Sequence, residues 1–369
     1  MIAIILEELI PIANKMISVN DLTPGLILSD AVITPNGKTL LGKGSTISQR
    51  TISLLSMWDV NYVFINIEDD QDPPTQEAAQ PKAAPSSFFV SPECIQFLQE
   101  YDSITTSAEN SFDFVRSKNK VPILSLKDTS FAIYSSILTT GPALMDYLLI
   151  NDFQLATKIS HHTVMVSYIC GIIGRQLHFN EEEMKALTLA GLLHDIGRMV
   201  VSSDNLPEPQ SHTINGAKLL RSVKGIPDEI ILSVLQHHEY LDGTGAPMGV
   251  DGSKIHKYAK IIAIANIFHN NSYREEYCNP FTALNILSNE MFGKLDPSIC
   301  QLFTQQVRDS LVNCNVMLSD NREATIIFFP ASNSNTPIVR TTDEKLIDLS
   351  TEKDITILRM CTPDYVPMI

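Results

Sequence analysis

The sequence predicts a mainly α protein, in which a helical domain lies between a small N-terminal α+β unit and a short β-rich C-terminal appendage. Apolar residues recur at helical spacings of three and four from about residue 152 to residue 310. Short strand-like runs separated by turn residues occupy both ends of the chain. A stretch rich in Pro, Ala and Gln, QDPPTQEAAQPKAAPSS at 71–87, has the composition of a linker.

These changes of pattern divide the chain into five segments. We expect the N-terminal α+β unit at 1–70, the linker at 71–90, a helical connector at 91–151, the all-α domain at 152–310 and the β-rich appendage at 311–369. The length of 369 residues and the hydrophobic content of 44% suffice for two or three units with cores of their own. We interpret residues 1–15 as an extension or a misplaced start, so that translation begins at Met1 or at Met16.

Turns and strands alternate in the N-terminal unit. DLTPG at 21–25 and PNG at 35–37 are typical of turns, and the run from Leu26 to Thr34 between them is strand-like. A helix from about Ser48 to Trp58 and a strand from Tyr62 to Ile65 complete the unit. The unit has no glycine-rich loop or cofactor signature that would distinguish a sensor from a docking surface.

Local signals mark one helix start and the end of the helical pattern. Asn180 is a favoured N-cap residue, and the three glutamates after it stand in the first turn, where the helix dipole favours negative charge. Near Leu311 the period changes, and the tail carries strand-like runs at 325–329, 337–339 and 355–358.

The net charge and the apolar runs exclude two classes of partner. A formal charge of −15 opposes general binding of DNA or RNA, because Lys and Arg hold phosphate backbones. No apolar run reaches the roughly 18 residues of a membrane helix, so we expect no membrane partner and a cytoplasmic protein. Six scattered cysteines suit a reducing compartment.

Residues of the metal-ligand type fall on the apolar faces of the predicted helices. His162 continues a stripe of Val166 and Ile169, and His194 continues a stripe of Leu187 and Gly191. A single buried histidine more often bonds to a backbone carbonyl than to a metal. The group as a whole favours a metal site, since imidazoles with a bridging carboxylate suit Fe, Mn or Zn; its members are His162, His194, Asp195, His212, His237 and His238.

Six motifs stand in order along this region. The two longest are LLHDIGR at 192–198 and HHEYLDGTGAP at 237–247. The shorter ones are HHTVMVS at 161–167, HTINGAKLL at 212–220, AKIIAIANIFHN at 259–270 and KLDPSICQLF at 294–303. Together they resemble the motifs of the HD-GYP family of cyclic di-GMP phosphodiesterases. The β-rich tail and residues 17–65 also resemble units that often accompany this domain.

The resemblance implies an HD-type helical domain that hydrolyses cyclic di-GMP to pGpG and GMP with two divalent metal ions, Fe or Mn most often and Zn as another option. It assigns the metal ligands, with Asp195 as the bridge, to His162, His194, Asp195, His212, His237, His238 and Asn266. The catalytic residues that it implies are Asp195, Arg198 and Asp242. It places substrate contacts at Arg198, Gly243, Gly245, Ala246, Pro247 and Arg274.

Several positions depart from the family's pattern. Asn266 stands where the family has an aspartate ligand, and a neutral amide is a poorer ligand. His269, on the same helix face, either substitutes for it or lies at the surface. Arg198 replaces the usual lysine and keeps its charge, whereas Ala246 removes the tyrosine of GYP. Lys158 stands where three-metal members carry a glutamate, so we expect two ions at most.

Three functions follow from these motifs and departures. The favoured one is a divergent metal-dependent phosphodiesterase acting on cyclic di-GMP in bacterial signalling. The alternative is a weak or inactive homologue that regulates by binding the nucleotide or a partner protein. An HD-type phosphohydrolase with another nucleotide substrate is the third. The cyclic dinucleotide is the expected ligand, while a signalling protein partner, a homodimer, the metal's identity and the input signal stay open.

Overall fold

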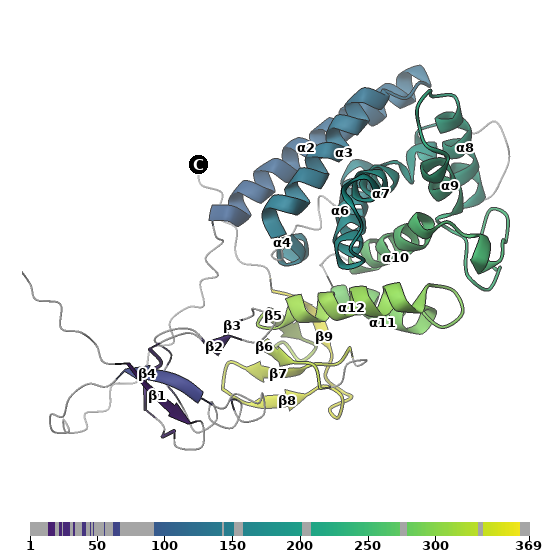
Figure 1. Ribbon diagram of the computed structural model, residues 1–369. Coiled ribbons are helices and arrows are strands. Elements are labelled where there is room, and N and C mark those ends of the chain that lie inside the picture. Colours follow the sequence, from purple (N-terminus) through teal and green to yellow (C-terminus); the bar gives the residue numbers. More distant parts are fainter. Residues whose placement is uncertain are drawn as a thin grey trace, which may run out of the picture. The chain divides into compact units, whose positions relative to one another are not determined.

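The computed structural model describes most of the chain from residue 92 onward and short segments before it. The described ranges are 14–18, 22–23, 25–29, 32–33, 39–41, 45, 47, 55, 62–66, 92–141, 144–150, 158–200, 208–273, 279–330 and 335–361. The chain forms two compact units, Met1–Ala84 and Pro85–Ile369. Helices dominate the second unit (Figure 1), which confirms the predicted mainly α class.

The first unit contains two small antiparallel sheets. Strand β1 (Asn14–Ser18) pairs with β4 (Tyr62–Asn66), and β2 (Val32–Ile33) pairs with β3 (Thr39–Leu41). The predicted strand at 62–65 is confirmed. Among the described residues of the strand expected from Leu26 to Thr34, Leu28 forms an isolated bridge to Ile65, and Val32–Ile33 form β2. The helix predicted at 48–58 lies outside the described residues, apart from Leu55. The described core of this unit contains Leu22, Leu28, Val32, Ile47, Leu55, Val63 and Ile65.

The second unit is built from helices that pack around α6 and α10. The helical elements are α2 (Pro92–Lys118), α3 (Ile123–Thr140), α4 (Leu144–Ile150), α6 (Ile159–Gln176), α7 (Glu181–Leu193), η3 (Ile196–Met199), α8 (Gln210–Arg221), α9 (Asp228–Gln236), η4 (Gly252–Lys254), α10 (Lys257–Ser272), α11 (Pro280–Glu290) and α12 (Pro297–Leu311). Helix α6 packs against α7, and α10 contacts both of them and α9. Helix α10 therefore lies in contact with the three helices α6, α7 and α9.

Helix α7 begins at the predicted cap. The Asn180 side chain accepts a hydrogen bond from the backbone N–H of Glu183 at 3.0 Å, and the Glu183 carboxylate accepts one from the Asn180 N–H at 3.1 Å. This reciprocal capping box satisfies two N–H groups that the helix leaves without partners, and a cap of this kind contributes about 1 kcal/mol. The cap fixes where the helix starts, and so which residues stand at its far end.

A five-stranded antiparallel sheet follows the last helix. It has the order β8-β7-β6-β5-β9, with β5 (Asn315–Leu318), β6 (Glu323–Phe328), β7 (Ile338–Thr341), β8 (Leu346–Asp348) and β9 (Ile357–Met360). The three predicted strand runs are confirmed as β6, β7 and β9, while β5 and β8 are additional. Alternate residues such as Val316 and Ile326 are buried and join the core of the helices. The five predicted segment boundaries stay predictions.

Candidate metal centre

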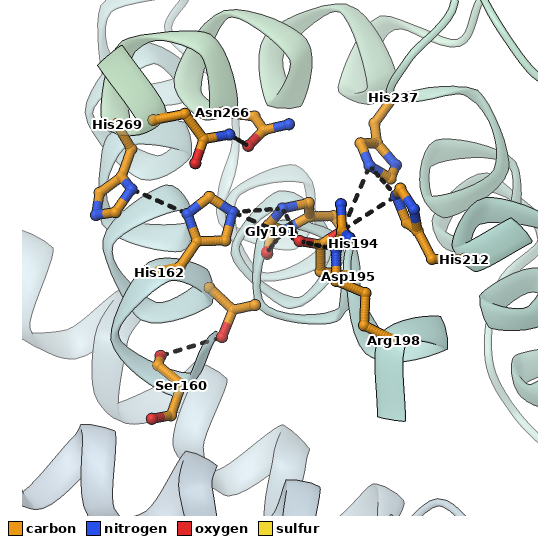
Figure 2. A network of polar contacts seen from close by, with 12 residues as sticks. Ser160, His162, Gly191, His194, Asp195, Arg198, His212, His237, Asn266 and His269 are labelled. Carbon is orange, nitrogen blue, oxygen red and sulfur yellow. Dashed lines mark hydrogen bonds and ion pairs between the residues drawn. The ribbon is translucent and has the colours of Figure 1, made fainter. Parts of the chain in front are cut away.

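The predicted ligand residues converge at the ends and inner faces of α6, α7, α8 and α9 (Figure 2). His194 and His237 stand directly after the last residues of α7 and α9, His162 lies in the first turn of α6, and His212 lies in the first turn of α8. Of the five histidines and one aspartate predicted as ligands, His238 is partly exposed and the other five residues are buried. The structure thus brings together residues that are up to 76 positions apart in the chain, from His162 to His238 (238 − 162).

One group of possible ligands, the His162 group, consists of His162, His194 and Asp195. The Nε2 atoms of the two histidines are 3.1 Å apart, and each lies 3.6 Å from Asp195 Oδ2. Ligand atoms around one ion, with bonds of about 2.1 Å, stand about 3 Å apart. This spacing therefore fits a shared cation.

The other group, the His238 group, consists of His212, His237 and His238. His212 Nε2 and His237 Nε2 are 3.3 Å apart, and they lie 3.1 Å and 3.8 Å from Asp195 Oδ1. Asp195 thus presents one carboxylate oxygen to each group. This is the arrangement that a bridging carboxylate needs, and the bridging role that the resemblance implies for Asp195 stays a prediction.

The backbone places Asp195 between the two groups. Helix α7 ends before His194, and Asp195 leaves the helical conformation with φ of −102° and ψ of 13° before η3 begins. At Gly197 a Cβ atom would stand 1.9 Å from the carbonyl oxygen of His212. Only glycine permits so close an approach, and this approach brings η3 and its aspartate against α8.

Hydrogen bonds on the far side of each ring orient three of the histidines. His194 Nδ1 donates to the carbonyl of Gly191, and His237 Nδ1 donates to that of Val234, both at 2.8 Å. His212 Nδ1 bonds to the Glu208 carboxylate. A ring that donates from Nδ1 turns an unprotonated Nε2 toward the cluster, as in histidine metal ligands.

Burial favours the neutral form of several histidines in the cluster. Burial, followed by the nearby histidines, lowers the pKa of His162 and of His238 from 6.5 to about 3. Burial also lowers the pKa of His194. Burial by itself raises the pKa of Asp195, but the facing histidines and Arg198 outweigh it and hold the pKa below its ordinary value. Neutral imidazoles around an ionised carboxylate are the protonation states that metal binding requires.

Helix α10 covers the cluster on the His162 side, where Figure 2 shows Asn266 and His269. The Asn266 side-chain oxygen accepts a hydrogen bond from Asn270 Nδ2 at 2.7 Å. His269 is buried, and its Nδ1 lies 2.9 Å from His162 Nδ1. The expectation that His269 could be a surface residue is therefore wrong. It contacts the far side of His162 and belongs to neither ligand group.

Arg198 lies at the edge of the cluster. Its Nε is 2.8 Å from Asp195 Oδ2, Nη1 is 3.9 Å from the Glu208 carboxylate, and its side chain is 38% exposed. The guanidinium thus forms an ion pair with the predicted bridging residue and still reaches solvent. Its predicted role in substrate contact stays a prediction.

The predicted substrate loop folds back onto the histidine pair. Ala246 N donates to the carbonyl of His238 at 2.9 Å, and a Cβ at Gly245 would stand 2.2 Å from Tyr240 N. The buried Glu239 carboxylate accepts hydrogen bonds from the N–H groups of Met248 at 2.7 Å and Val250 at 3.1 Å. Glu239 therefore anchors the loop beside the ligands.

The remaining predicted site residues are less closely tied to the cluster. Asp242 is exposed, and its carboxylate accepts from the Thr244 N–H and hydroxyl at 2.9 Å and 2.6 Å, which lowers its pKa. Gly243 has φ of +75°, which favours glycine, and Pro247 follows a cis peptide bond. Arg274 lies outside the described residues. Catalytic and substrate roles for these positions stay predictions.

The sequence motifs did not single out Glu208 and Glu239. Glu208 lies four residues before His212, in the stretch that precedes α8, and only the fold shows that it reaches the ring. Glu239 directly follows the histidine pair, so the sequence pointed to a role in the site. The sequence did not distinguish a residue that anchors the loop from a further metal ligand. Both residues hold parts of the site in place.

Two unpartnered atoms indicate that the cluster is suited to cations. Asp195 Oδ1 and His238 Nε2 are buried and have no hydrogen-bond partner among the described residues. A buried acceptor without a partner costs about 1–3 kcal/mol. A cation in the His238 group could bind both atoms, so the residues present fit bound divalent metal ions.

Comparison with known families agrees with this class of site. Residues 148–299 match the HD domain family, so the segment that holds the cluster is an HD domain, and HD domains are metal-dependent. This match to the HD domain, together with relatives named as cyclic-dinucleotide phosphodiesterases, confirms the resemblance that the motifs predicted.

Two curated relatives act on cyclic dinucleotides by name. The chain is 27% identical over 208 residues to a cyclic di-GMP phosphodiesterase of Pseudomonas aeruginosa. The aligned region covers 53% of this chain and 50% of the relative. It is 32% identical over 164 residues to 3'3'-cGAMP-specific phosphodiesterase 1 of Vibrio cholerae, with 40% of this chain and 37% of the relative covered. The chain thus matches half or less of the length of these relatives.

One solved structure aligns with most of this chain. An HDG"Y"P protein from Bdellovibrio bacteriovorus aligns with 79% of this chain and 98% of its own, at 18% identity and a TM-score of 0.49. Within the described ranges, the helices are too short or too polar to cross a bilayer.

Proposed function

We propose that this chain is a phosphodiesterase that opens cyclic di-GMP to pGpG, and further to GMP, at a centre of two divalent ions, Fe or Mn with Zn as an alternative. The observation that carries the proposal is Asp195, whose two oxygens face two separate groups of histidines. The named activities of the relatives support a cyclic dinucleotide as substrate.

The hydrolysis adds water across one P–O bond. The oxygen of water bonds to phosphorus, and the 3′ oxygen leaves and takes a proton, so that the ring opens. Paired divalent ions, when bound, lower the pKa of water and neutralise phosphate charge. The chain's own part is to hold Asp195 ionised, to favour neutral imidazoles at His162 and His238 by burial, and to offer Arg198, whose guanidinium can bind phosphate oxygens bidentately.

A second candidate is an inactive or weak homologue that binds the nucleotide or a partner protein. Asn266 favours it, because its amide oxygen already accepts a hydrogen bond and supplies no negative charge for the second cation. Ala246 favours it too, since the loop lacks the aromatic side chain that the family's motif places there. In either role we propose that the protein acts in the cytoplasm as a signalling component.

Anaerobic purification followed by metal analysis and nucleotide assays tests both candidates. We expect bound Fe or Mn and hydrolysis of cyclic di-GMP, with 3'3'-cGAMP as the comparison substrate. Hydrolysis should be lost in His194→Ala and Asp195→Ala but kept in His178→Asn, which replaces a histidine outside the cluster. Binding without turnover, with turnover gained in Asn266→Asp, would instead support the regulator. Absence of bound metal under every condition would overturn the ligand assignments.

A further inference from the structure

We propose that the two ligand groups bind cations unequally, with a tight first ion in the His238 group and a weak second ion in the His162 group. Asp195 Oδ1 serves the first ion, and Oδ2 serves the second. This ranking rests on the metal centre of the proposed function and deepens it. It follows from the hydrogen bonds and ion pairs that each ligand atom already makes in the metal-free chain.

Two ligand atoms that serve the first ion are buried and have no hydrogen-bond partner among the described residues. Asp195 Oδ1 and His238 Nε2 are buried without a hydrogen bond among the described residues, although His212 Nε2 lies only 3.1 Å from Oδ1. Their desolvation is a cost that the folded chain already carries. A cation recovers this cost without displacing any existing bond.

Two of the three rings of the His238 group, those of His212 and His237, are also held in the orientation of a metal ligand. His212 Nδ1 faces the Glu208 carboxylate and His237 Nδ1 faces the carbonyl of Val234. The carboxylate and carbonyl oxygens act as acceptors in these contacts, so each ring donates from Nδ1. Each Nε2 lone pair is therefore directed at the cluster before a cation binds.

The His162 group lacks such a lock on one of its rings. His162 Nδ1 faces His269 Nδ1 at 2.9 Å, and a neutral imidazole can donate or accept. If His269 donates, His162 carries its proton on Nε2 and cannot bind a metal. His269 Nε2 is itself buried without a hydrogen bond among the described residues, so nothing on that side selects the tautomer. The cation must impose it.

Asp195 Oδ2 of the His162 group is already engaged, and so is the oxygen of Asn266, which the resemblance assigns as a further ligand. Arg198 Nε lies 2.8 Å from Asp195 Oδ2, so a cation there shares the oxygen with a guanidinium or displaces it. The Asn266 side-chain oxygen accepts a hydrogen bond from Asn270 Nδ2 at 2.7 Å. A second ion also meets the charge of the first across one carboxylate. The Arg198 and Asn270 contacts engage oxygen atoms on the side of the second ion, and neither engages Asp195 Oδ1 or His238 Nε2, which serve the first.

Equilibrium dialysis of the metal-free full chain against Mn²⁺, without nucleotide, measures the two affinities directly. We expect one ion per chain at low Mn²⁺, and a second at concentrations at least about tenfold higher. Electron paramagnetic resonance distinguishes the stages, because a single Mn²⁺ gives a six-line spectrum and a coupled pair does not. Two ions bound with equal affinity would overturn the ranking, whatever the nucleotide assays show.

Substitutions identify which group holds which ion. His238→Ala should remove the tight ion, whereas His162→Ala should keep it and lose only the weak one. Asn266→Asp should tighten the second ion by about 10–100-fold, the range typical of changes around a metal ligand. His178→Asn is the matched control, and circular dichroism checks that each variant folds. A tight ion that survives His238→Ala but is lost in His162→Ala would reverse the order and contradict the proposal.

Discussion

Glu208 holds His212 in the orientation that a metal ligand needs. Its carboxylate bonds to His212 Nδ1 and lies 3.9 Å from Arg198 Nη1. Partners of this kind typically change metal affinity by about 10–100-fold when removed. We predict that Glu208→Ala weakens the first Mn²⁺ by that amount in calorimetric titration, while Glu208→Gln, which keeps an acceptor oxygen, weakens it less.

The control for this prediction is Glu182→Ala, which removes an exposed glutamate from the first turn of α7. It should leave the Mn²⁺ affinity unchanged. Equal affinities in Glu208→Ala and Glu182→Ala would show that the Glu208 contact does not position His212.

The loop at 242–250 depends on Glu239, the buried acid that follows the histidine pair. Hydrogen bonds to a charged acceptor contribute about 1.5–3 kcal/mol each. We therefore predict that Glu239→Ala speeds hydrogen exchange at the Met248 and Val250 amides at least about tenfold, as measured by NMR or mass spectrometry. Metal binding at His212 and His237 should change less, because α8 and α9 hold those ligands.

Asp251→Ala is the matched control in the same loop. The Asp251 carboxylate bonds to the N–H and hydroxyl of Ser253, and not to the Met248 or Val250 amides. Exchange at those two amides should stay at the wild-type rate in this variant. Fast exchange in the wild type, equal to that in Glu239→Ala, would mean that the loop is not anchored in solution.

Local patterns predicted the elements that depend on neighbouring residues, and missed those that depend on distant ones. The Asn180 cap was predictable because the cap and the acids that reciprocate it lie within one turn. Strands β5 and β8 were not predicted: β5 pairs with β6 and β9, and β8 pairs with β7. Their pairing partners cannot be identified from local alternation alone.

At the scale of the whole molecule, motif order predicted which residues gather, but not how each is held. His162, His194 and His237 were expected together, and the fold confirms their proximity. The position of His269 stayed ambiguous, because one helix face can point at a site or at solvent. Only the packing of α10 on α6 decides that it lies behind His162. Protonation of the ligands likewise depends on the burial that the whole fold creates.

That burial ties the stability of the metal-free protein to pH. His162 and His238 have pKa values of about 3 in the folded chain and regain 6.5 when unfolded. Between these values the unfolded chain binds more protons, so the free energy of unfolding rises with pH. The contribution is complete above pH 6.5 and is lost progressively as the pH falls toward 3. Each histidine contributes a slope of up to about 1.4 kcal/mol per pH unit.

Urea unfolding of the metal-free protein, followed by circular dichroism, should therefore give a lower free energy of unfolding at pH 5.5 than at pH 7.5. The expected loss is about 1.4 kcal/mol for each histidine that stays neutral in the folded state. His238→Asn should reduce the difference by one histidine's share, whereas His178→Asn, outside the cluster, should keep it. Equal stability at the two pH values would mean that the buried imidazoles bind protons without unfolding. In that case the neutral ligand set would not be a property of the fold, and bound metal would have to create it.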